Sequence, residues 1–489
     1  RFSIQSSLDN KVFMQSSILQ HPNVLKTKHK LQLTAARLGN QHIKLAVTGL
    51  SGSGKTAFIT SLVNQLVEAN EAAHLPFFSV IRESRLIGVK REAQPNLTFS
   101  RFAYEEAMQD LTQAKPQWPA STTGISQVRL KIKYKKNKGL SKYLSEDATL
   151  TLDITDYPGE WLLDLPILEK DYAQWSKHCQ DELNDPQRNK LAKQFFRALQ
   201  DLDLHAKGDE LALQNIAELY SQYLKSCQSH GYQLLQPGRF ILPGELSGAP
   251  VLHFFPISEE LLEKQGVDLN SPTKNSNAEL LINRFEHYKS HVVQPFYKEH
   301  FKAFDRQVVL VDCLSALNRG FHSYQDLQKA LDWLMGSFQY GSSNILNRLF
   351  KPKIDKLVFA ASKADHITPE QQTNLVKLLE SMLHNARKQI QYDGVSTEST
   401  AVSAIRASKS GVGKLDGESI PVLQGTNSYG KPVTLFPGEV PQSCPTPEFW
   451  ENQKFEFPKL SPLLMNGEHV LPHIRMDQVL DFLLADKLL

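Results

Sequence analysis

The sequence predicts an α/β fold in which helices cover a mostly parallel sheet. Strands are expected at 307–313 and 356–361, where most residues are apolar, and a helical pattern runs between them through 327–334. A third strand, 43–47, leads through a glycine-rich turn into another amphipathic helix. Parallel strands need long crossover connections, which are usually helices, so this alternation indicates a parallel sheet covered by helices.

The glycine-rich turn, residues 49–56, has the sequence GLSGSGKT. This pattern matches a P-loop, in which glycines let backbone N–H groups point at phosphates near a helix N-terminus. Lys55 is expected to reach the β- and γ-phosphates, and the Thr56 hydroxyl to bind Mg²⁺. A turn that only resembles the motif is the weaker alternative, because the strand and the helix stand where the motif needs them. The residues expected to contact the phosphates are Gly49, Ser51, Gly52, Ser53, Gly54, Lys55, Thr56 and Ala57.

Two runs of alternating polar and apolar residues, 128–135 and 150–156, predict an antiparallel hairpin. The second run ends in the sequence DYPGE. Asp156 is expected to bind Mg²⁺, directly or through water, and the backbone N–H of Gly159 to face a γ-phosphate. A surface turn without a ligand is the alternative, which the preceding P-loop disfavours.

The chain of 489 residues is long enough for several domains. Strand-like patterns stop after the hairpin, give way to a long region of helical pattern, and then resume. The helical region is therefore interpreted as an insertion in one nucleotide-binding core. The expected parts are an N-terminal arm or helix (1–40), a core (41–160 and 305–408) with a smaller insertion (68–120), a helical insertion domain (161–304) and a Pro- and Gly-rich subdomain that ends in a helix (409–489).

Apolar residues make up 41% of the chain and charged residues 22%, and the formal net charge is +3. These values are ordinary for a soluble globular protein and give no indication of nucleic-acid binding. The four cysteines form no CxxC or CxxH pair, so neither a zinc site nor a disulfide framework is expected and a reducing compartment fits best. No run approaches the roughly 18 apolar residues that a membrane span needs. A soluble protein is therefore expected.

Five motifs follow one another in the order GLSGSGKT, STTG, DYPGE, SKAD and SAI. This order resembles the translation-factor class of P-loop GTPases over about half of the chain. The resemblance implies that Thr122 closes over Mg²⁺ and the γ-phosphate, that Asp365 accepts hydrogen bonds from guanine, and that Lys363 packs along the base. The backbone N–H of Ala404, which follows Ser403, would meet the guanine O6. Adenine would leave the Asp365 carboxylate unpaired at a cost of several kcal/mol, which favours GTP.

The string TTGI, 122–125, is similar to the switch of heterotrimeric G-protein α subunits. Those proteins carry an arginine three positions before the threonine, where this chain has Pro119. If the chain supplies its own arginine to the transition state, that arginine must come from elsewhere. For any single candidate, an exposed surface arginine is the more common alternative. The candidates in the segment before the switch are Arg82, Arg85, Arg91 and Arg101.

Two further positions depart from the GTPase pattern. Glu160 stands where such enzymes carry the glutamine that orients the attacking water, and a carboxylate beside a γ-phosphate is expected to be repelled or partly protonated. Slow intrinsic turnover is the consequence. Ser362 replaces the usual asparagine of the N-K-x-D element, which removes bridging hydrogen bonds and weakens the expectation of strict guanine selectivity.

The larger pattern includes W-P-x-x-T before the switch, DYPGEW, the helical middle, SKAD and a Pro- and Gly-rich tail that contains HIRMD. Over nearly the whole chain it resembles the bacterial YcjX family of stress-associated, Ras-like GTPases. The resemblance implies a Ras-like fold and a Mg²⁺-dependent GTPase that acts as a conformational switch in a stress response. It also implies a cytoplasmic protein, or one held at the inner membrane by a membrane-protein partner.

Two other functions stay open at this point. One is a nucleotide-gated scaffold that binds a nucleotide but scarcely hydrolyses it. The other is an ATP-using P-loop enzyme such as a kinase, which would have no use for the SKAD motif. The oligomeric state and the downstream partner also stay open.

Overall fold

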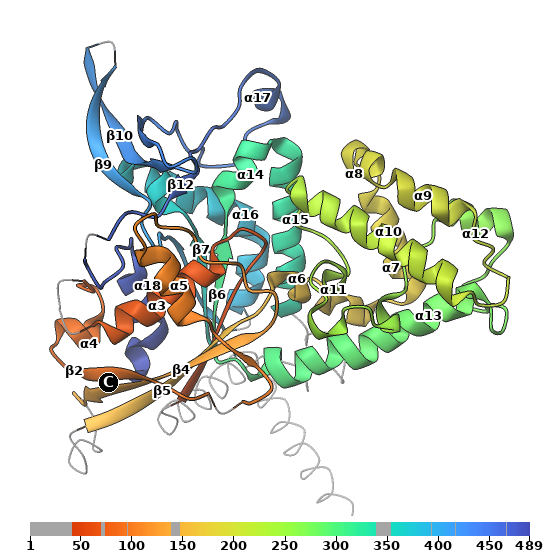
Figure 1. Cartoon of the computed structure of the whole chain (residues 1–489), viewed down its shortest axis with the longest axis horizontal. Helices are drawn as coiled ribbons and strands as arrows, with labels where there is room; N and C mark the ends of the chain where they lie inside the picture. Colours follow the sequence, from red (N-terminus) through yellow and green to blue (C-terminus); the bar gives the residue numbers. More distant parts are fainter. Residues whose placement is uncertain are drawn as a thin grey trace, which may run out of the picture.

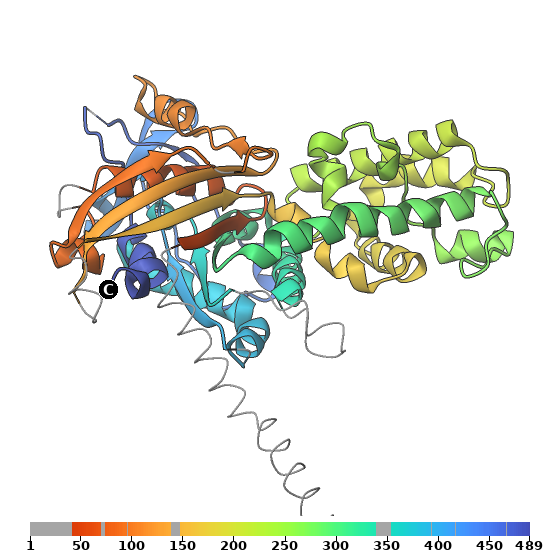
Figure 2. The ribbon, with the colours of Figure 1, turned by 90° about the horizontal axis from the view of Figure 1, so that it is seen from below.

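The structure is a computed structural model that describes residues 42–69, 74–94, 96–137, 147–338, 354–392, 394–415, 417–465 and 467–489. The predicted N-terminal arm, 1–40, lies outside these residues. Figure 1 shows a core that contains a large sheet and, beside it, a lobe made of helices. From below, α13 (Asn277–Tyr288) and the π-helical segments that continue it, Lys289–Val293 and Phe296–His300, run from the helical lobe back toward the core (Figure 2).

An eight-stranded sheet forms the centre of the core, in the order β2-β4-β5-β1-β6-β7-β8, with β3 beside β4. β1 is parallel to β5 and β6, and β7 is parallel to β6 and β8. β4 is antiparallel to β5 and to β2. The predicted α/β fold, with a mostly parallel sheet and an antiparallel hairpin, is confirmed. The strands are β1 (His42–Gly49), β2 (Leu86–Glu92), β3 (Ser100–Arg101), β4 (Ser126–Lys135), β5 (Asp147–Asp156), β6 (Arg306–Val311), β7 (Lys356–Ala361) and β8 (Ser396–Ala401).

Burial explains the place of each strand in the sheet. Every residue of β6 is buried, as expected for a central strand covered on both faces. In β4, the buried Leu130 and Ile132 alternate with Lys131 and Lys133, whose ammonium groups pair with carboxylates of neighbouring strands. β2 has no fully buried residue, which suits a strand at the sheet edge.

Two layers of helices cover the two faces of the sheet. Val308 and Leu310 of β6 belong to one hydrophobic cluster, with α3 and α18, and Val309 and Val311 belong to the other, with α14, α15 and α16. This division follows from the alternation of side chains along a strand. The helices of the core are α3 (Lys55–Val67), α4 (Ser79–Arg82), α5 (Tyr104–Thr112), α14 (Cys313–Arg319), α15 (Phe321–Phe338), α16 (Gln372–Tyr392), α17 (Pro447–Asn452) and α18 (Met476–Leu484).

The helical lobe lies between β5 and β6 in the sequence. Its centre is aromatic, with the ring of Trp175 5.1 Å from that of Phe285 and 5.3 Å from that of Phe254. The same hydrophobic cluster continues into the layer of α14 to α16, so the lobe and the core share one packed interior. Within the described ranges, no helix combines the length and the apolar character that crossing a membrane requires. Besides α13, the helices here are α6 (Gly159–Leu162), α7 (Tyr172–Glu182), α8 (Pro186–Leu191), α9 (Lys193–Gln200), α10 (Glu210–Ser229), α11 (Gly238–Ile241) and α12 (Glu259–Gln265).

A second, antiparallel sheet follows β8. It consists of β9 (Ser408–Leu415), β10 (Glu418–Asn427), β11 (Pro432–Leu435) and β12 (Leu460–Ser461). The β9–β10 hairpin projects from the top of the core in Figure 1. Trp118, just before the predicted switch, donates its indole N–H to Leu460 O at 2.8 Å and so joins that segment to β12.

The last residues of the chain pack at the N-terminal ends of the central strands β6 and β7. Arg306, the fully buried first residue of β6, donates two hydrogen bonds to Asp486, at 2.8 and 2.6 Å. Lys356, the first residue of β7, donates to the same carboxylate at 2.7 Å. Asp486 therefore compensates two cations at the start of two central strands.

We expect Asp486→Ala to lower the free energy of unfolding by about 3 kcal/mol, because it leaves buried cations without their main partner. Chemical denaturation of the full chain measures this change. Glu456→Ala is the matched control, because its partner Lys454 is exposed and the pair is expected to contribute little. Equal free energies of unfolding of the two variants would show that Asp486 does not stabilise the fold by compensating Arg306 and Lys356.

Candidate functional site

The loop 49–56 connects β1 to α3. Gly52 and Gly54 have φ angles of 77° and 87°, left-handed values that side chains rarely adopt, so both positions require glycine. The Lys55 ammonium folds back over the loop and donates to Gly49 O at 2.6 Å. A glycine-rich bend at a helix N-terminus, with a lysine folded over it, is the arrangement that a phosphate cradle needs.

Three oxygens meet beside this loop. The hydroxyl of Thr122 donates to Asp156 Oδ2 at 2.5 Å and lies 3.3 Å from the hydroxyl of Thr56. Neighbouring oxygens around Mg²⁺ are about 2.9 Å apart, given Mg–O distances of 2.0 to 2.1 Å. The three oxygens therefore fit one Mg²⁺ shell, although no cluster of three metal-binding His, Cys, Asp or Glu side chains occurs in the described part of the chain. When bound, Mg²⁺ would bridge and neutralise nucleotide phosphates there.

The electrostatics of Asp156 support the same interpretation. Burial raises the pKa of this carboxyl group, and the nearby Glu160 adds to the effect, although Lys55 and the hydroxyl of Thr122 oppose it. Its second oxygen, Oδ1, is buried and has no hydrogen-bond partner among the described residues. A buried carboxylate with a spare oxygen is costly unless a cation compensates it.

Gly159 brings the DYPGE segment against the P-loop. A Cβ atom on Gly159 would lie 2.5 Å from Gly49 O and 2.8 Å from Gly49 C, so only glycine allows this contact. The preceding Tyr157 is buried and accepts a hydrogen bond from Gln307 of β6 at 2.7 Å. The backbone of Gly159 is thus held beside the phosphate cradle.

The carboxylate of Glu160 lies toward the helical lobe. It is 4% exposed, and its Oε1 accepts a hydrogen bond from Gln228 of α10 at 3.4 Å. Its other oxygen, Oε2, is buried without a partner among the residues described. The position predicted to replace the water-orienting glutamine therefore contacts the lobe in this structure.

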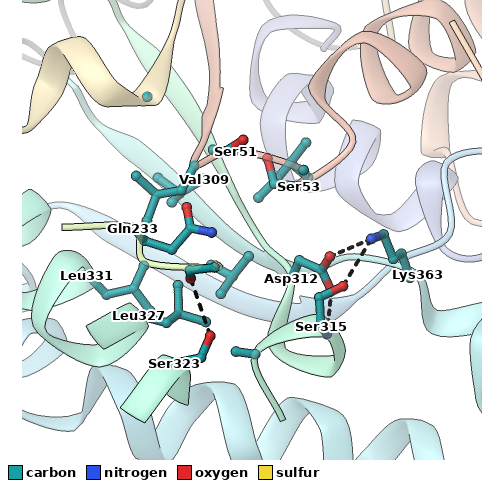
Figure 3. A pocket seen from close by; sticks show the side chains of 18 of the residues that line it. Ser51, Ser53, Gln233, Val309, Asp312, Ser315, Ser323, Leu327, Leu331 and Lys363 are labelled. Atoms are coloured by element: carbon teal, nitrogen blue, oxygen red, sulfur yellow. Dashed lines mark hydrogen bonds and ion pairs between the residues drawn. The ribbon is translucent and has the colours of Figure 1, made fainter. Parts of the chain in front are cut away.

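Lys363, after β7, is fixed by the loop that follows β6. Its ammonium forms an ion pair with Asp312 and lies 3.4 Å from the hydroxyl of Ser315 (Figure 3). Burial alone would raise the pKa of Asp312, but Lys363 and the hydrogen bonds from Ser315 outweigh it and lower the pKa. The Lys363 side chain is therefore held in one orientation at the C-terminal ends of the central strands.

Asp365 is 3% exposed, and its carboxylate is already bonded within the protein. It accepts the backbone N–H of Ala407 at 2.5 Å and lies 3.3 Å from His366 Nδ1. Burial opposes ionisation, but the charge and hydrogen bond of His366 and the Ala407 N–H lower the pKa of Asp365. The carboxylate is an ionised acceptor, so a base bound here must share it with these groups.

The loop after β8 contains Ser403 and Ala404 and lies beside the SKAD loop. Ser403 exchanges two backbone hydrogen bonds with Ile474, at 3.2 and 2.8 Å. Ala364 N–H donates to Val402 O at 3.0 Å and joins the two loops. The structure therefore brings the predicted base-reading residues to neighbouring loops at one edge of the sheet.

Two cavities flank the P-loop. The first, here called the P-loop cavity, has a volume of about 200 Å³, and its wall includes Ser51, Gly159, Gln233 and Lys363 (Figure 3). The second, here called the switch cavity, has a volume of about 750 Å³ and lies between the segment 119–126 and the helical lobe. Residues from the P-loop, the switch and the lobe therefore face common spaces.

The structure does not bring Arg82 and Arg85 to this site. The Arg85 guanidinium is buried and donates to Lys135 O at 3.1 Å and to Leu488 O. Lys135 pairs with the first residue of the ten-residue strand β5, whereas Asp156 is its last, so Arg85 lies about 30 Å from Asp156. Arg82 is exposed at the end of α4, three residues before Arg85.

Sequence reasoning missed two residues, Asp164 and Arg239, that join the DYPGE segment to the helical lobe. Asp164 is buried and accepts the N–H of Gly238 at 2.8 Å and the hydroxyl of Tyr288 at 2.5 Å. Arg239 lies over the ring of Trp161, 3.3 Å from its centroid. Neither residue belongs to a recognisable motif, although both are charged residues among apolar neighbours, which is the signal that could have marked them.

We expect Gly159→Ala to destabilise the protein by about 1 to 3 kcal/mol, because the added methyl group overlaps the P-loop backbone. Displacement of Gly49 should also weaken binding of a triphosphate at the P-loop. Thermal unfolding and calorimetric titration measure the two effects. Gly88→Ala is the control, since a Cβ atom there meets nothing within 4 Å. Wild-type behaviour of Gly159→Ala would refute the close contact.

Asp164 makes stability depend on pH. Burial raises its pKa to about 6, although Tyr288 and Gly238 act in the opposite direction. Because an unfolded aspartate has a pKa near 3.9, the stability that this group contributes is full below about pH 4 and is lost as the pH rises through 6. Relative to Asp164→Asn, the wild-type free energy of unfolding should fall by about 3 kcal/mol between about pH 4 and 7. Denaturant unfolding across this range tests it, and parallel pH profiles would contradict it.

Comparisons with known proteins agree with these observations. A family model described as the YcjX-like family, DUF463, matches residues 43–488. A curated protein of Escherichia coli named Ras-like GTPase YcjX is 44% identical over 465 residues, which is 95% of this chain and 99% of that protein. A protein of the same name from Shewanella oneidensis is 45% identical over 478 residues, 95% of this chain and 98% of the relative. The chain therefore belongs to the YcjX-like family, as the order of its motifs indicates.

Proposed function

We propose that the chain binds GTP with Mg²⁺, hydrolyses it to GDP and inorganic phosphate, and acts as a conformational switch. The observation that carries this proposal is the meeting of the Thr56 and Thr122 hydroxyls with the Asp156 carboxylate beside the P-loop. These oxygens come from a helix, a loop and a strand that the nucleotide and its metal would hold together. Both relatives are named Ras-like GTPase, which supports the same reaction.

Within this site, Lys55 and the Gly159 N–H would contact the γ-phosphate, and Gly159 already lies against the P-loop. Thr122 would bind Mg²⁺ through its hydroxyl and so hold the switch segment closed over the γ-phosphate. Loss of the γ-phosphate removes these contacts and releases both segments, which is how GTPase switches change affinity for a partner.

Guanine is the base proposed for the second part of the site. The buried Asp365 is an ionised acceptor, which suits the N1–H and amino donors of guanine and not the edge of adenine. Lys363 would pack along the base, and the loop of Ser403 and Ala404 would present a backbone N–H to O6.

Turnover is proposed to be slow. Glu160 is a carboxylate, and it contacts Gln228 of the helical lobe instead of the P-loop. A side chain turned toward the lobe in this way does not align a water molecule for attack on a γ-phosphate. The same observation favours a second candidate function, a nucleotide-gated scaffold with negligible hydrolysis.

The cellular role rests on the family resemblance. It points to a cytoplasmic protein of a bacterial stress response, or one held at the inner membrane by a membrane-protein partner. The nucleotide state would then set the affinity for that partner.

Calorimetric titration of the full chain tests the nucleotide assignment. With Mg²⁺, GTP should bind at least about tenfold more tightly than ATP, because only guanine pairs with an acceptor such as Asp365. Chelation of Mg²⁺ should weaken GTP binding, and Lys55→Ala should abolish it. Lys225→Ala, an exposed lysine of α10, is the control. Equal affinities for ATP and GTP would sink the guanine assignment.

Single-turnover phosphate release separates the switch from the scaffold. A switch releases phosphate slowly but measurably from bound GTP, and it does so only with Mg²⁺. Tight binding of GTP without any phosphate release would leave the scaffold as the function.

A further inference from the structure

The helical lobe places one arginine beside the switch. Arg239 lines the switch cavity together with Thr56, Thr122 and Trp161. Two of these residues, Thr56 and Thr122, belong to the proposed Mg²⁺ site. Arg239 therefore lines the same cavity as the two threonines whose hydroxyls would hold the metal, and its guanidinium lies over the ring of Trp161, another residue of the cavity wall.

The charge of Arg239 is poorly compensated within the described residues. Its side chain is only 8% exposed, yet its guanidinium reaches Glu245 at no less than 3.2 Å and Pro243 O at 3.4 Å. Glu245 itself is 69% exposed, so solvent screens most of its charge. The main contact is the face of Trp161, which attracts a cation but does not neutralise it.

Arg188, another buried arginine of the lobe, has a charge that its partners compensate fully. It donates to Asp326 at 2.5 Å and to Leu234 O at 2.9 Å. The buried carboxylate of Asp164 interacts with the charge and the backbone N–H of Arg239. Its hydrogen bonds of 2.8 and 2.5 Å, however, come from the Gly238 N–H and the Tyr288 hydroxyl, and within the described residues none comes from the Arg239 guanidinium. Because burying a charge is costly unless it is paired, Arg239 is suited to an anion that enters the cavity.

The backbone around Arg239 is joined directly to the DYPGE segment. A Cβ atom on Gly238 would lie 2.1 Å from Glu160 O, so these two segments of the chain touch through their main-chain atoms. Gly159, the residue before Glu160, touches the P-loop at Gly49 in the same way. Arg239 is therefore connected to the phosphate cradle by two consecutive backbone contacts.

We propose that Arg239 is the arginine that stabilises the transition state of GTP hydrolysis, an inference that rests on the proposed function. In this reaction the bond from the γ-phosphorus to the β–γ bridging oxygen breaks while a water oxygen bonds to the phosphorus. One water proton stays on the released phosphate, and the other goes to solvent. Negative charge on the bridging oxygen and the γ-phosphoryl group would draw the guanidinium from Trp161 into the cavity, where its N–H groups donate to those oxygens.

Arg101 also lines the switch cavity but is committed elsewhere. Its side chain is 70% exposed and forms an ion pair with Glu105 at 2.5 Å. Arg91 shares the same carboxylate at 2.7 Å and lies over the ring of Tyr104. Of the arginines that face the cavity, Arg239 alone combines burial with a weakly compensated charge in the described structure.

Single-turnover hydrolysis of GTP by the full chain tests this proposal. Arg239→Ala should slow phosphate release by about 100-fold or more, while affinity for GTP and GDP stays within about threefold of wild type. The GDP complex of the wild type should also bind aluminium fluoride, which mimics the transferring phosphoryl group, and that of the variant should not. A purely structural role for Arg239 would not produce this selective loss.

Two further variants keep the test decisive. Arg197→Ala, an exposed arginine of the same lobe, should behave like wild type in both assays. Arg239→Lys keeps a cation over Trp161 but lacks the forked donors, so it should fold normally even if Arg239→Ala does not, and should lose aluminium fluoride binding. Wild-type rates in Arg239→Lys and Arg239→Ala would overturn the proposal. A wild-type chain that binds but never hydrolyses GTP would instead overturn the proposed function.

Discussion

The main-chain contact between Gly159 and Gly49 is the constraint on which the site depends. It exists only because Gly159 has no side chain, and it places the segment after β5 directly on the P-loop. A second contact of the same kind joins Gly238 to Glu160. Through these two contacts the phosphate cradle, the DYPGE segment and the helical lobe form one continuous structure. A displacement of the cradle would therefore press on the lobe, because close-packed main-chain atoms are hardly compressible.

The polar groups around these contacts follow one electrostatic logic. Asp156 is buried with a spare oxygen beside the hydroxyls of Thr56 and Thr122, and Arg239, which lines the same cavity as these two threonines, is buried with only weak partners among the described residues. An anion with a spare oxygen and a weakly compensated cation, both near the residues that line the switch cavity, suit a metal-bound polyphosphate, which presents both signs of charge. Elsewhere the charges are paired internally, as in Arg188 with Asp326 and Arg306 with Asp486. At the site, by contrast, these charged groups lack strong internal partners and are available to a ligand.

Local patterns predicted the parts of this structure that local physics determines. The P-loop, the hairpin of β4 and β5 and the buried strands β6 and β7 follow from glycine positions and apolar periodicity within short windows. β2 was not predicted, because an edge strand with no buried residue has no clear period. Arg239 could not be predicted as a site residue, because more than eighty positions separate it from Asp156 in the sequence. Only the packing of the lobe brings it to the cavity that Thr56 and Thr122 also line. The spacing of residues along the sequence does not show which distant residues the tertiary packing brings together.

The placement of the helical lobe also bears on how the chain folds as it is made. β1 pairs on one side with β5 and on the other with β6, and these two strands are separated in the sequence by the entire lobe. At synthesis rates of roughly 5 to 20 residues per second, the ribosome needs on the order of 13 to 50 seconds to pass from the end of β1 to the end of β6. During that time β1 keeps one edge unpaired, while the lobe, whose contacts are closer in sequence, can already condense. The central strand of the protein is thus among the first to be made and among the last to be enclosed.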